Sequence, residues 1–106
     1  MPKYLVKASY TTEGVKGLAK DGGSKRRDAA TQLLTSLGGK VELTYFAFGA
    51  SDVYIVADMP DNVSVAAAAL AVNASGAVTT EIVVLLTAEE VDEACRRIPA
   101  YQPPGS

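Results

Sequence analysis

Residues 40–58, KVELTYFAFGASDVYIVAD, decide the fold of this chain. Apolar residues recur at every second position in 40–48 and again in 52–58, which is the period of a β-strand. The small residues 49–51 separate the two runs and favour a short turn. The stretch therefore predicts an antiparallel hairpin in the middle of the chain.

A helix is expected on each side of this hairpin. Residues 24–37 place alanines and leucines along one helical stripe, and Gly38 follows as a C-terminal cap. After the hairpin, Asp61 or Asn62 can cap an alanine-rich segment that carries no charge as far as Thr80. This second helix either packs closely on its own sheet or makes further contacts with other copies of the chain.

The segments farther out alternate again. Residues 3–10, KYLVKASY, and residues 79–86, TTEIVVLL, predict the first and last strands. Between the first strand and the first helix, the glycines of residues 11–23 allow only a short or irregular helix. The order strand, helix, strand, strand, helix, strand predicts an α+β, ferredoxin-like βαββαβ domain, with two helices on one face of a four-stranded antiparallel sheet.

The end of the chain predicts a short C-terminal helix. Thr87 and Glu90 have the spacing of a capping box, and arginines follow in the last turn. We expect this helix to pack on the body through an apolar stripe, which consists of Val91, Ala94, Cys95 and Ile98. Residues 99–106 are expected to form an extended tail, and residues 1–106 a single domain.

Large apolar residues remain on both faces of the predicted sheet. Phe46, Phe48, Tyr54, Val56, Val83 and Leu85 are expected to share one face of three strands, so that whichever face meets the helices, the opposite one keeps large apolar side chains. Exposed apolar patches of this extent usually mark partner surfaces. We therefore expect a homo-oligomer, at least a dimer, whose sheets stack face to face.

The composition argues against several classes of function. The formal net charge of -2 argues against a nucleic-acid partner, because phosphate binding requires an excess of Lys and Arg. The chain contains no histidine, which removes histidine-ligated metal sites and Ser-His or Cys-His nucleophiles. We expect no metal and no cofactor. The sequence also lacks a secretory signal and a membrane-spanning segment, so we expect cytoplasmic residence and no membrane partner.

The stretch DGGSKRR, residues 21–27, is a candidate anion-binding site. Free N–H groups at a helix start would act there together with the side chains of Ser24, Lys25, Arg26 and Arg27. The alternative is a plain turn into a helix, capped by Ser24, in which solvated cations pair with Asp21 or Asp28. The spacing is not that of a nucleotide-binding P-loop.

Aromatic residues supply candidates for a pocket or an interface. Tyr10, Tyr45 and Tyr54 can line a pocket for a flat aromatic compound or can simply pack, and Phe48 is a further candidate. Asp52 can act as a general base if it is desolvated, although an aspartate after a glycine turn commonly binds the backbone. No catalytic residue is assigned.

Several segments of the chain resemble the GYD-domain family of small bacterial proteins. They are GGSKRRDAA, SLGGKVELTYFAFGASDVYIVADMPDN, ALAVNASGAV and VLLTAEEVDEA, and the resemblance extends from about Tyr4 to the PPG near the end. The family is placed among the dimeric α/β-barrel, ferredoxin-like proteins, so the resemblance implies a sheet-on-sheet dimer. Where the family has a Gly-x-Tyr-Asp motif, this chain has Gly49, Ala50, Ser51 and Asp52, with serine in the place of tyrosine.

The resemblance carries no general activity over to this chain. The function we expect is therefore a small homo-oligomeric barrel domain of unassigned biochemical activity, with self-association as its main property. One alternative is a cofactor-free enzyme that acts on a small hydrophobic or aromatic compound. The other is a sensor domain that binds a small anion or ligand.

Overall fold

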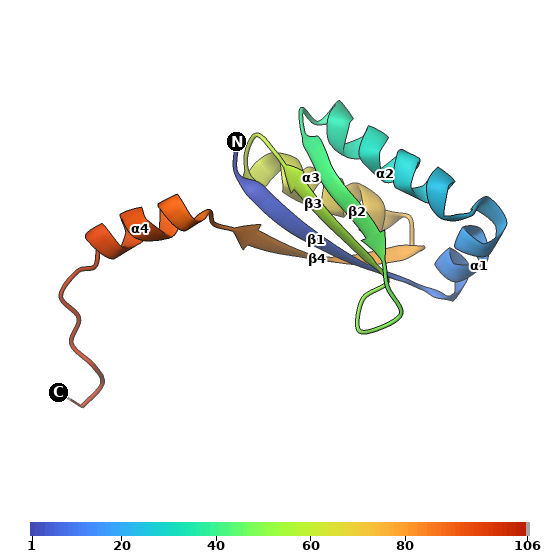
Figure 1. The fold of residues 1–106 in the computed structure, drawn as a ribbon. Coiled ribbons are helices and arrows are strands. Elements are labelled where there is room, and N and C mark those ends of the chain that lie inside the picture. The colour runs from blue at the N-terminus through green and yellow to red at the C-terminus, as the bar shows by residue number, and fades with distance from the viewer. Residues whose placement is uncertain (106) are drawn as a thin grey trace.

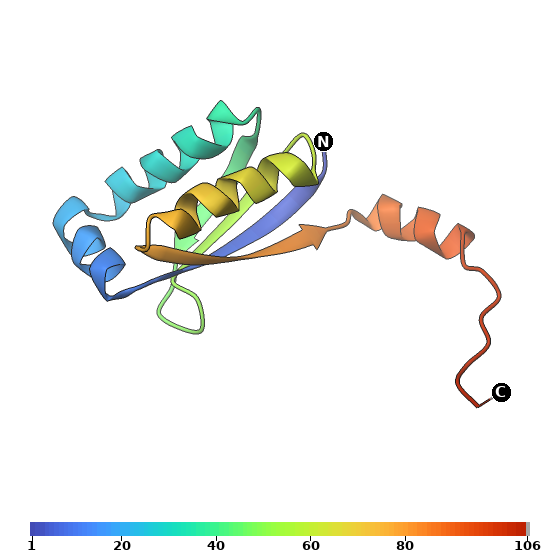
Figure 2. The ribbon, with the colours of Figure 1, turned by 180° about the vertical axis from the view of Figure 1, so that it is seen from behind.

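The computed structural model describes residues 1–105, and within them the chain forms one four-stranded antiparallel sheet and four helices. In chain order the elements are β1 (Lys3–Tyr10), α1 (Thr12–Asp21), α2 (Gly23–Ser36), β2 (Lys40–Phe46), β3 (Val53–Asp58), α3 (Asn62–Ala74), β4 (Val78–Leu85) and α4 (Ala88–Arg96). The strand order is β2-β3-β1-β4. Helices α2 and α3 lie side by side over one face of the sheet, and the other face is bare (Figures 1 and 2). This α+β arrangement is consistent with the predicted ferredoxin-like fold.

The segment after β1 is more regular than its glycines predict. Residues 12–21 form a complete helix, α1, because Gly14 permits a close approach to the backbone before β4. A Cβ atom at Gly14 would lie 2.0 Å from the carbonyl oxygen of Ala77. Thr11 caps α1 by accepting from the Gly14 N–H at 3.3 Å, and its hydroxyl donates to the Gly76 carbonyl at 2.9 Å. Tertiary packing therefore outweighs the low helix propensity of glycine.

Helix α2 begins one residue earlier than the sequence indicates. Gly22 occupies the N-cap position with φ of 84°, and no side chain caps the helix. Ser24 therefore lies inside the first turn, and its predicted role as the cap is wrong. The left-handed conformation at Gly22 lets the end of α1 pass directly into α2, which leaves no extended residue for a serine cap.

The core lies between the helices and the covered face of the sheet. Its buried side chains are Tyr4, Ala8, Leu34, Val53, Ile55, Ala57, Met59, Val65, Ala68 and Val78. Tyr4 is the largest of them and donates its hydroxyl hydrogen bond to Asn62 at the start of α3. Asp61 caps the same helix by accepting from the Ser64 N–H at 2.8 Å. The first turn of α3 is thus held by a side chain from the sheet as well as by its own cap.

A β-bulge in β2 changes the face that its side chains occupy. The pairing of β2 with β3 shifts register between Val41 and Leu43, so the extra residue reverses the alternation from there on. As a result Phe46 pairs with Val53 on the covered face, and Tyr45 pairs with Tyr54 on the bare face.

The predicted placement of Phe46 on the same face as Tyr54 and Val56 is therefore wrong, because the bulge is not visible in a simple alternation. Strand β2 also ends at Phe46, two residues earlier than the alternation predicts. Phe48 consequently lies in the β2–β3 loop and is fully exposed, with a relative exposure of 103%.

Helix α4 extends away from the body and buries none of its residues (Figure 1). Its predicted capping box is confirmed, since the Thr87 hydroxyl accepts from the Glu90 N–H at 3.1 Å and the Glu90 carboxylate accepts from the Thr87 N–H at 2.9 Å. The expected packing of its apolar stripe on the body is wrong, and Cys95 is exposed. Local signals suffice to form the helix, but they carry no information about what the helix contacts.

Neither a spanning helix nor a metal-binding cluster is found in residues 1–105. None of the helices described there combines the length and the apolar character needed to cross a membrane. That part of the chain also has no group of three or more His, Cys, Asp or Glu side chains placed to hold a metal ion.

Candidate functional site

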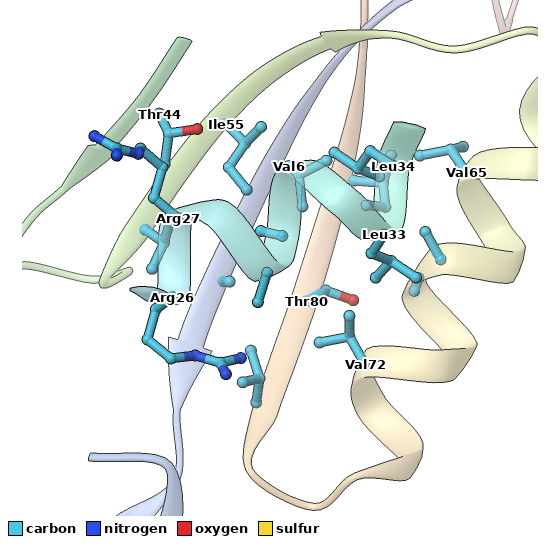
Figure 3. Close-up of a pocket in the computed structure, with 18 of the residues that line it drawn as sticks. Val6, Arg26, Arg27, Leu33, Leu34, Thr44, Ile55, Val65, Val72 and Thr80 are labelled. Atoms are coloured by element: carbon cyan, nitrogen blue, oxygen red, sulfur yellow. The ribbon is translucent and has the colours of Figure 1, made fainter. Parts of the chain in front are cut away.

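A cavity of about 130 Å³ lies between the sheet and helices α2 and α3. Its walls are mainly aliphatic, and the side chains that Figure 3 labels there include Val6, Leu33, Leu34, Ile55, Val65 and Val72. Alanines of α2 and α3 supply much of the remaining wall, because their small side chains do not fill the space over the sheet. An apolar cavity with a few polar groups is the usual setting of a small-molecule site.

Two threonines bring hydroxyl groups into this wall. The Thr80 hydroxyl donates to the Asn73 side-chain oxygen at 3.2 Å. The Thr44 hydroxyl is buried and has no hydrogen-bond partner within residues 1–105. In Figure 3 the Thr44 oxygen points toward the Ile55 side of the cavity. The Thr44 hydroxyl can therefore still bind a polar atom of a ligand.

A second, outer hollow of about 440 Å³ adjoins the cavity. It lies among α1, the start of α2, the C-terminal part of α3 and the start of β4. The residues that line both spaces are Tyr10, Arg26, Leu33, Val72 and Val78. These five residues form the boundary between the hollow and the interior cavity.

Arg26 is the charged residue of this boundary. In Figure 3 its side chain extends toward the Val72 side, whereas Arg27 leaves the same turn of α2 toward the Thr44 side. The Arg26 guanidinium lies 3.8 Å from the Asp21 carboxylate, which Lys25 approaches at 3.6 Å. One carboxylate thus serves two cations, so the Arg26 guanidinium keeps donors for a further acceptor.

The four residues proposed for an anion site do not converge on one point. Ser24 and Lys25 are exposed, whereas Arg26 and Arg27 line the cavity from different sides of α2. The acidic partners considered for the cations are present, since Asp21 pairs with Lys25 and Arg26. Arg27 pairs with Asp28 at 3.2 Å. Anion binding at this turn stays a prediction.

The aromatic candidates are divided between two places. Tyr10 lines the cavity, whereas Tyr45 and Tyr54 form a cross-strand pair on the bare face. The three tyrosines therefore do not line one common pocket. The Asp52 carboxylate accepts a hydrogen bond from the Tyr10 backbone N–H at 2.8 Å, which is the backbone-binding role considered for it.

The bare face of the sheet carries an apolar row across all four strands. The strand register aligns Leu43 with Val56, Val56 with Leu5, and Leu5 with Val83. The next row contains Tyr45, Tyr54, Lys7 and Glu81. Leu43 and Tyr45 keep 37% and 68% of their surface exposed, so this face is uncovered within the single chain.

Ion pairs border the apolar row on both sides. Lys7 lies 3.4 Å from Glu81, and Lys3 lies 3.0 Å from Asp58 and also contacts Glu42. Hydrogen bonds to Glu42, and then to Asp58, raise the pKa of the Lys3 amine. The charges on this face are thus neutralised by neighbours on the same chain.

The sequence alone did not identify the residues whose face of the sheet is set by the bulge in β2. Thr44, the unpartnered hydroxyl, and Leu43, the edge of the apolar row, both follow the register shift in β2. The β-branched threonine flanked by apolar residues was a signal of a strand, but the face that it occupies depends on the position of the bulge.

One comparison with known proteins gives a match. A family model described as "GYD domain" matches residues 4–95. No curated protein and no solved structure matches the chain significantly. The matched range takes in β1 except Lys3, the other three strands, α1 to α3, and α4 except Arg96.

Proposed function

This chain belongs to the GYD domain family, and on that premise we propose that it is a self-associating domain. Two copies pack the bare faces of their sheets together, so that each copy supplies the cover that the other lacks. The observation that carries this proposal is the apolar row of Leu43, Val56, Leu5 and Val83 across the full width of the sheet.

The chemistry of the bare face suits a contact between identical copies. Stable interfaces combine an apolar centre with a polar rim. Here the apolar row lies between the Lys7–Glu81 pair on one side and the Lys3–Asp58 pair on the other. Because each cation already has an acidic neighbour, two copies related by a two-fold axis can meet without uncompensated like charges.

Helix α4 supports the same proposal. Its apolar stripe includes Val91, with 47% of its surface exposed, and the adjoining Ile98 has 74% exposed, yet the helix packs on no part of its own body. Its polar side is internally paired, because Glu93 binds Arg96 at 2.8 Å and Arg97 at 2.9 Å. We propose that the stripe lies on the body of the second copy, so that burial of its apolar side chains stabilises the dimer.

The test is the mass of the protein in solution, measured by native mass spectrometry and light scattering. The chain has a mass of 11.0 kDa, so the wild type is expected at twice this value. Val56→Lys places a charge in the centre of the apolar row and is expected to give a folded monomer. Val15→Lys, on the exposed side of α1, is the matched control and is expected to remain dimeric.

Circular dichroism of each variant checks that the fold is retained. A wild type that is monomeric at every concentration would contradict the proposal. A Val56→Lys protein that stays folded and dimeric would contradict the placement of the interface on the bare face.

A further inference from the structure

We propose that the cavity under α2 and α3 and the adjoining hollow form a binding site for a small aromatic acid. The ring occupies the cavity, the carboxylate binds Arg26 at the boundary, and a second oxygen on the ring binds Thr44. This inference is separate from self-association, since the cavity and the bare face lie on opposite sides of the sheet.

The size of the cavity indicates the size of the apolar part of the ligand. An apolar cavity of about 150 Å³ in another protein binds benzene. The cavity here measures about 130 Å³ and has side chains such as Leu33, Ile55 and Val72 in its wall. A single six-membered ring therefore matches it, whereas a fused-ring compound is too large without repacking of the core.

Thr44 indicates a polar substituent on the ring. A buried hydroxyl without a partner is unfavourable, and protein cores satisfy nearly all such groups. The Thr44 hydroxyl is the buried side-chain group of residues 1–105 left in that state, and it lies in the wall of the cavity. A hydroxyl or keto oxygen on the ligand would complete its hydrogen bonding.

Arg26 indicates the charge of the ligand. It lines both the cavity and the outer hollow, so an anionic group bound to it can lie at the boundary while the ring lies inside. The guanidinium suits a carboxylate, because its donors match the two oxygens. Its contact with Asp21, at 3.8 Å, is long and is shared with Lys25, so a ligand carboxylate need not displace a strong ion pair.

The acidic residues near the hollow do not oppose an anion strongly. Glu13 lies 3.5 Å from Lys16, and Asp21 lies between Lys25 and Arg26. Each carboxylate of the hollow therefore has a cationic neighbour of its own. Tyr10, also at the boundary, adds a phenol side chain that can pack on the edge of the ring.

The experiment is isothermal titration calorimetry with four probes on the full chain. The principal probe is 4-hydroxybenzoate. Benzoate lacks only the ring hydroxyl, benzyl alcohol lacks the ring hydroxyl and the charge, and acetate lacks the ring together with its hydroxyl. We expect affinity to fall in the order 4-hydroxybenzoate, benzoate, benzyl alcohol, with no binding of acetate.

Three variants locate the probe. Arg26→Gln is expected to weaken 4-hydroxybenzoate binding about tenfold or more, as for the loss of a hydrogen bond to a charged group. Lys25→Gln removes the same charge from the same turn, but Lys25 does not line the cavity and acts only through its pair with Asp21. Its loss is therefore expected to weaken binding by at most about threefold, clearly less than the loss of Arg26. Ala30→Leu fills the cavity and is expected to abolish binding of all three ring-containing probes.

The outcomes separate the parts of the proposal. Failure of 4-hydroxybenzoate to bind the folded wild type overturns it, and so does equal weakening by Arg26→Gln and Lys25→Gln. Equal affinity for 4-hydroxybenzoate and benzoate overturns the assignment of Thr44. Because the order of probe affinities is measured on the wild type, the test does not depend on the Ala30→Leu variant folding.

Discussion

The two faces of the sheet are built from neighbouring residues but have different surroundings. Ile55 points to the helices and keeps 5% of its surface exposed, whereas Val56 points the other way and aligns with Leu5 and Leu43 on the bare face. The covered face is apolar along most of its length, and the bare face carries one apolar row between ion pairs. The difference shows that hydrophobicity marks a face for burial without saying whether the same chain or another molecule covers it.

The helices show the same contrast. Helix α3 contains no charged residue but lies on the sheet, where Val65 and Ala68 are buried. Helix α4 has a complete capping box and paired charges, yet it buries nothing within its own chain. Local interactions therefore suffice to form α4, but they do not place it in the fold. Tertiary packing on the sheet both places and stabilises α3.

The largest expected effect is on the covered face. Ile55→Ala removes a buried side chain next to the cavity and is expected to lower the free energy of unfolding by about 2–5 kcal/mol. This loss should not depend on protein concentration, because the contacts of Ile55 lie within one chain. Urea unfolding at two protein concentrations measures both properties.

The neighbouring Val56→Ala is the matched control for that comparison. Its effect is expected to be smaller at low protein concentration and to grow as the concentration rises, because Val56 is proposed to be buried only in the dimer. If the two variants respond to concentration in the same way, the two faces do not differ in the manner proposed.

A smaller effect, with the opposite sign, is expected at Thr44. Thr44→Val replaces the unpartnered hydroxyl with a methyl group of similar shape and should raise the free energy of unfolding by about 1 kcal/mol. Thr80→Val, in the same cavity wall, breaks a hydrogen bond to Asn73 and should lower it by about 1 kcal/mol. Thermal and urea unfolding without ligand measure the stability of the two variants. A loss of stability in both would mean that the Thr44 hydroxyl already has a partner.

The smallest losses of stability are expected when the N-cap residues of α3 and α4 are replaced. Asp61→Ala removes the cap of a helix that covers the sheet and should lower the melting temperature of the whole domain, though less than Ile55→Ala does. Thr87→Ala removes the cap of α4 and should cost about 1 kcal/mol of local helix stability, seen as a loss of helical dichroism, while the unfolding of an isolated monomer is unchanged. The comparison is made in the Val56→Lys monomer with and without Thr87→Ala. If Thr87→Ala lowered the melting temperature of this monomer, α4 would be packing on its own body.

The contribution of Asp61 should also depend on pH. The Ser64 backbone N–H and then the Ser64 side chain lower the pKa of the Asp61 carboxyl by hydrogen bonding to it. The stabilisation is therefore fully present above the ordinary aspartate pKa of about 3.9 and is lost as the pH falls through the lowered value. Wild type and Asp61→Ala should accordingly converge in melting temperature in this acidic range, and a constant difference would contradict the role of the charge.

Most of the secondary structure follows from the sequence. The alternation in residues 3–10, the helical stripe before Gly38 and the capping box at Thr87 predict elements that the structure contains. These signals are local, because they depend on neighbours within one turn of helix or a few residues of strand. The extent of α1 is an exception, since Gly14 serves a contact with Ala77, far away in the sequence.

The candidate site was less predictable. Arg26 and Arg27 were identified as cations at a helix start, but their position at the cavity depends on how α2 lies over the sheet. Thr44 carries no distinctive motif, and its place in the cavity wall follows from the bulge in β2. A register shift of one residue exchanges the two faces of a strand, and a two-residue period in the sequence does not reveal it.

The sequence by itself determined the α+β class, the order of the strands and helices, and the presence of large apolar residues on both faces of the sheet. Only the tertiary structure decided which face the helices cover, where the cavity lies, and that α4 stands apart from the body. The physical reason is the range of the interactions: capping, alternation and helical periodicity act between near neighbours, whereas register, close packing and cavities depend on segments that meet only after the chain has folded.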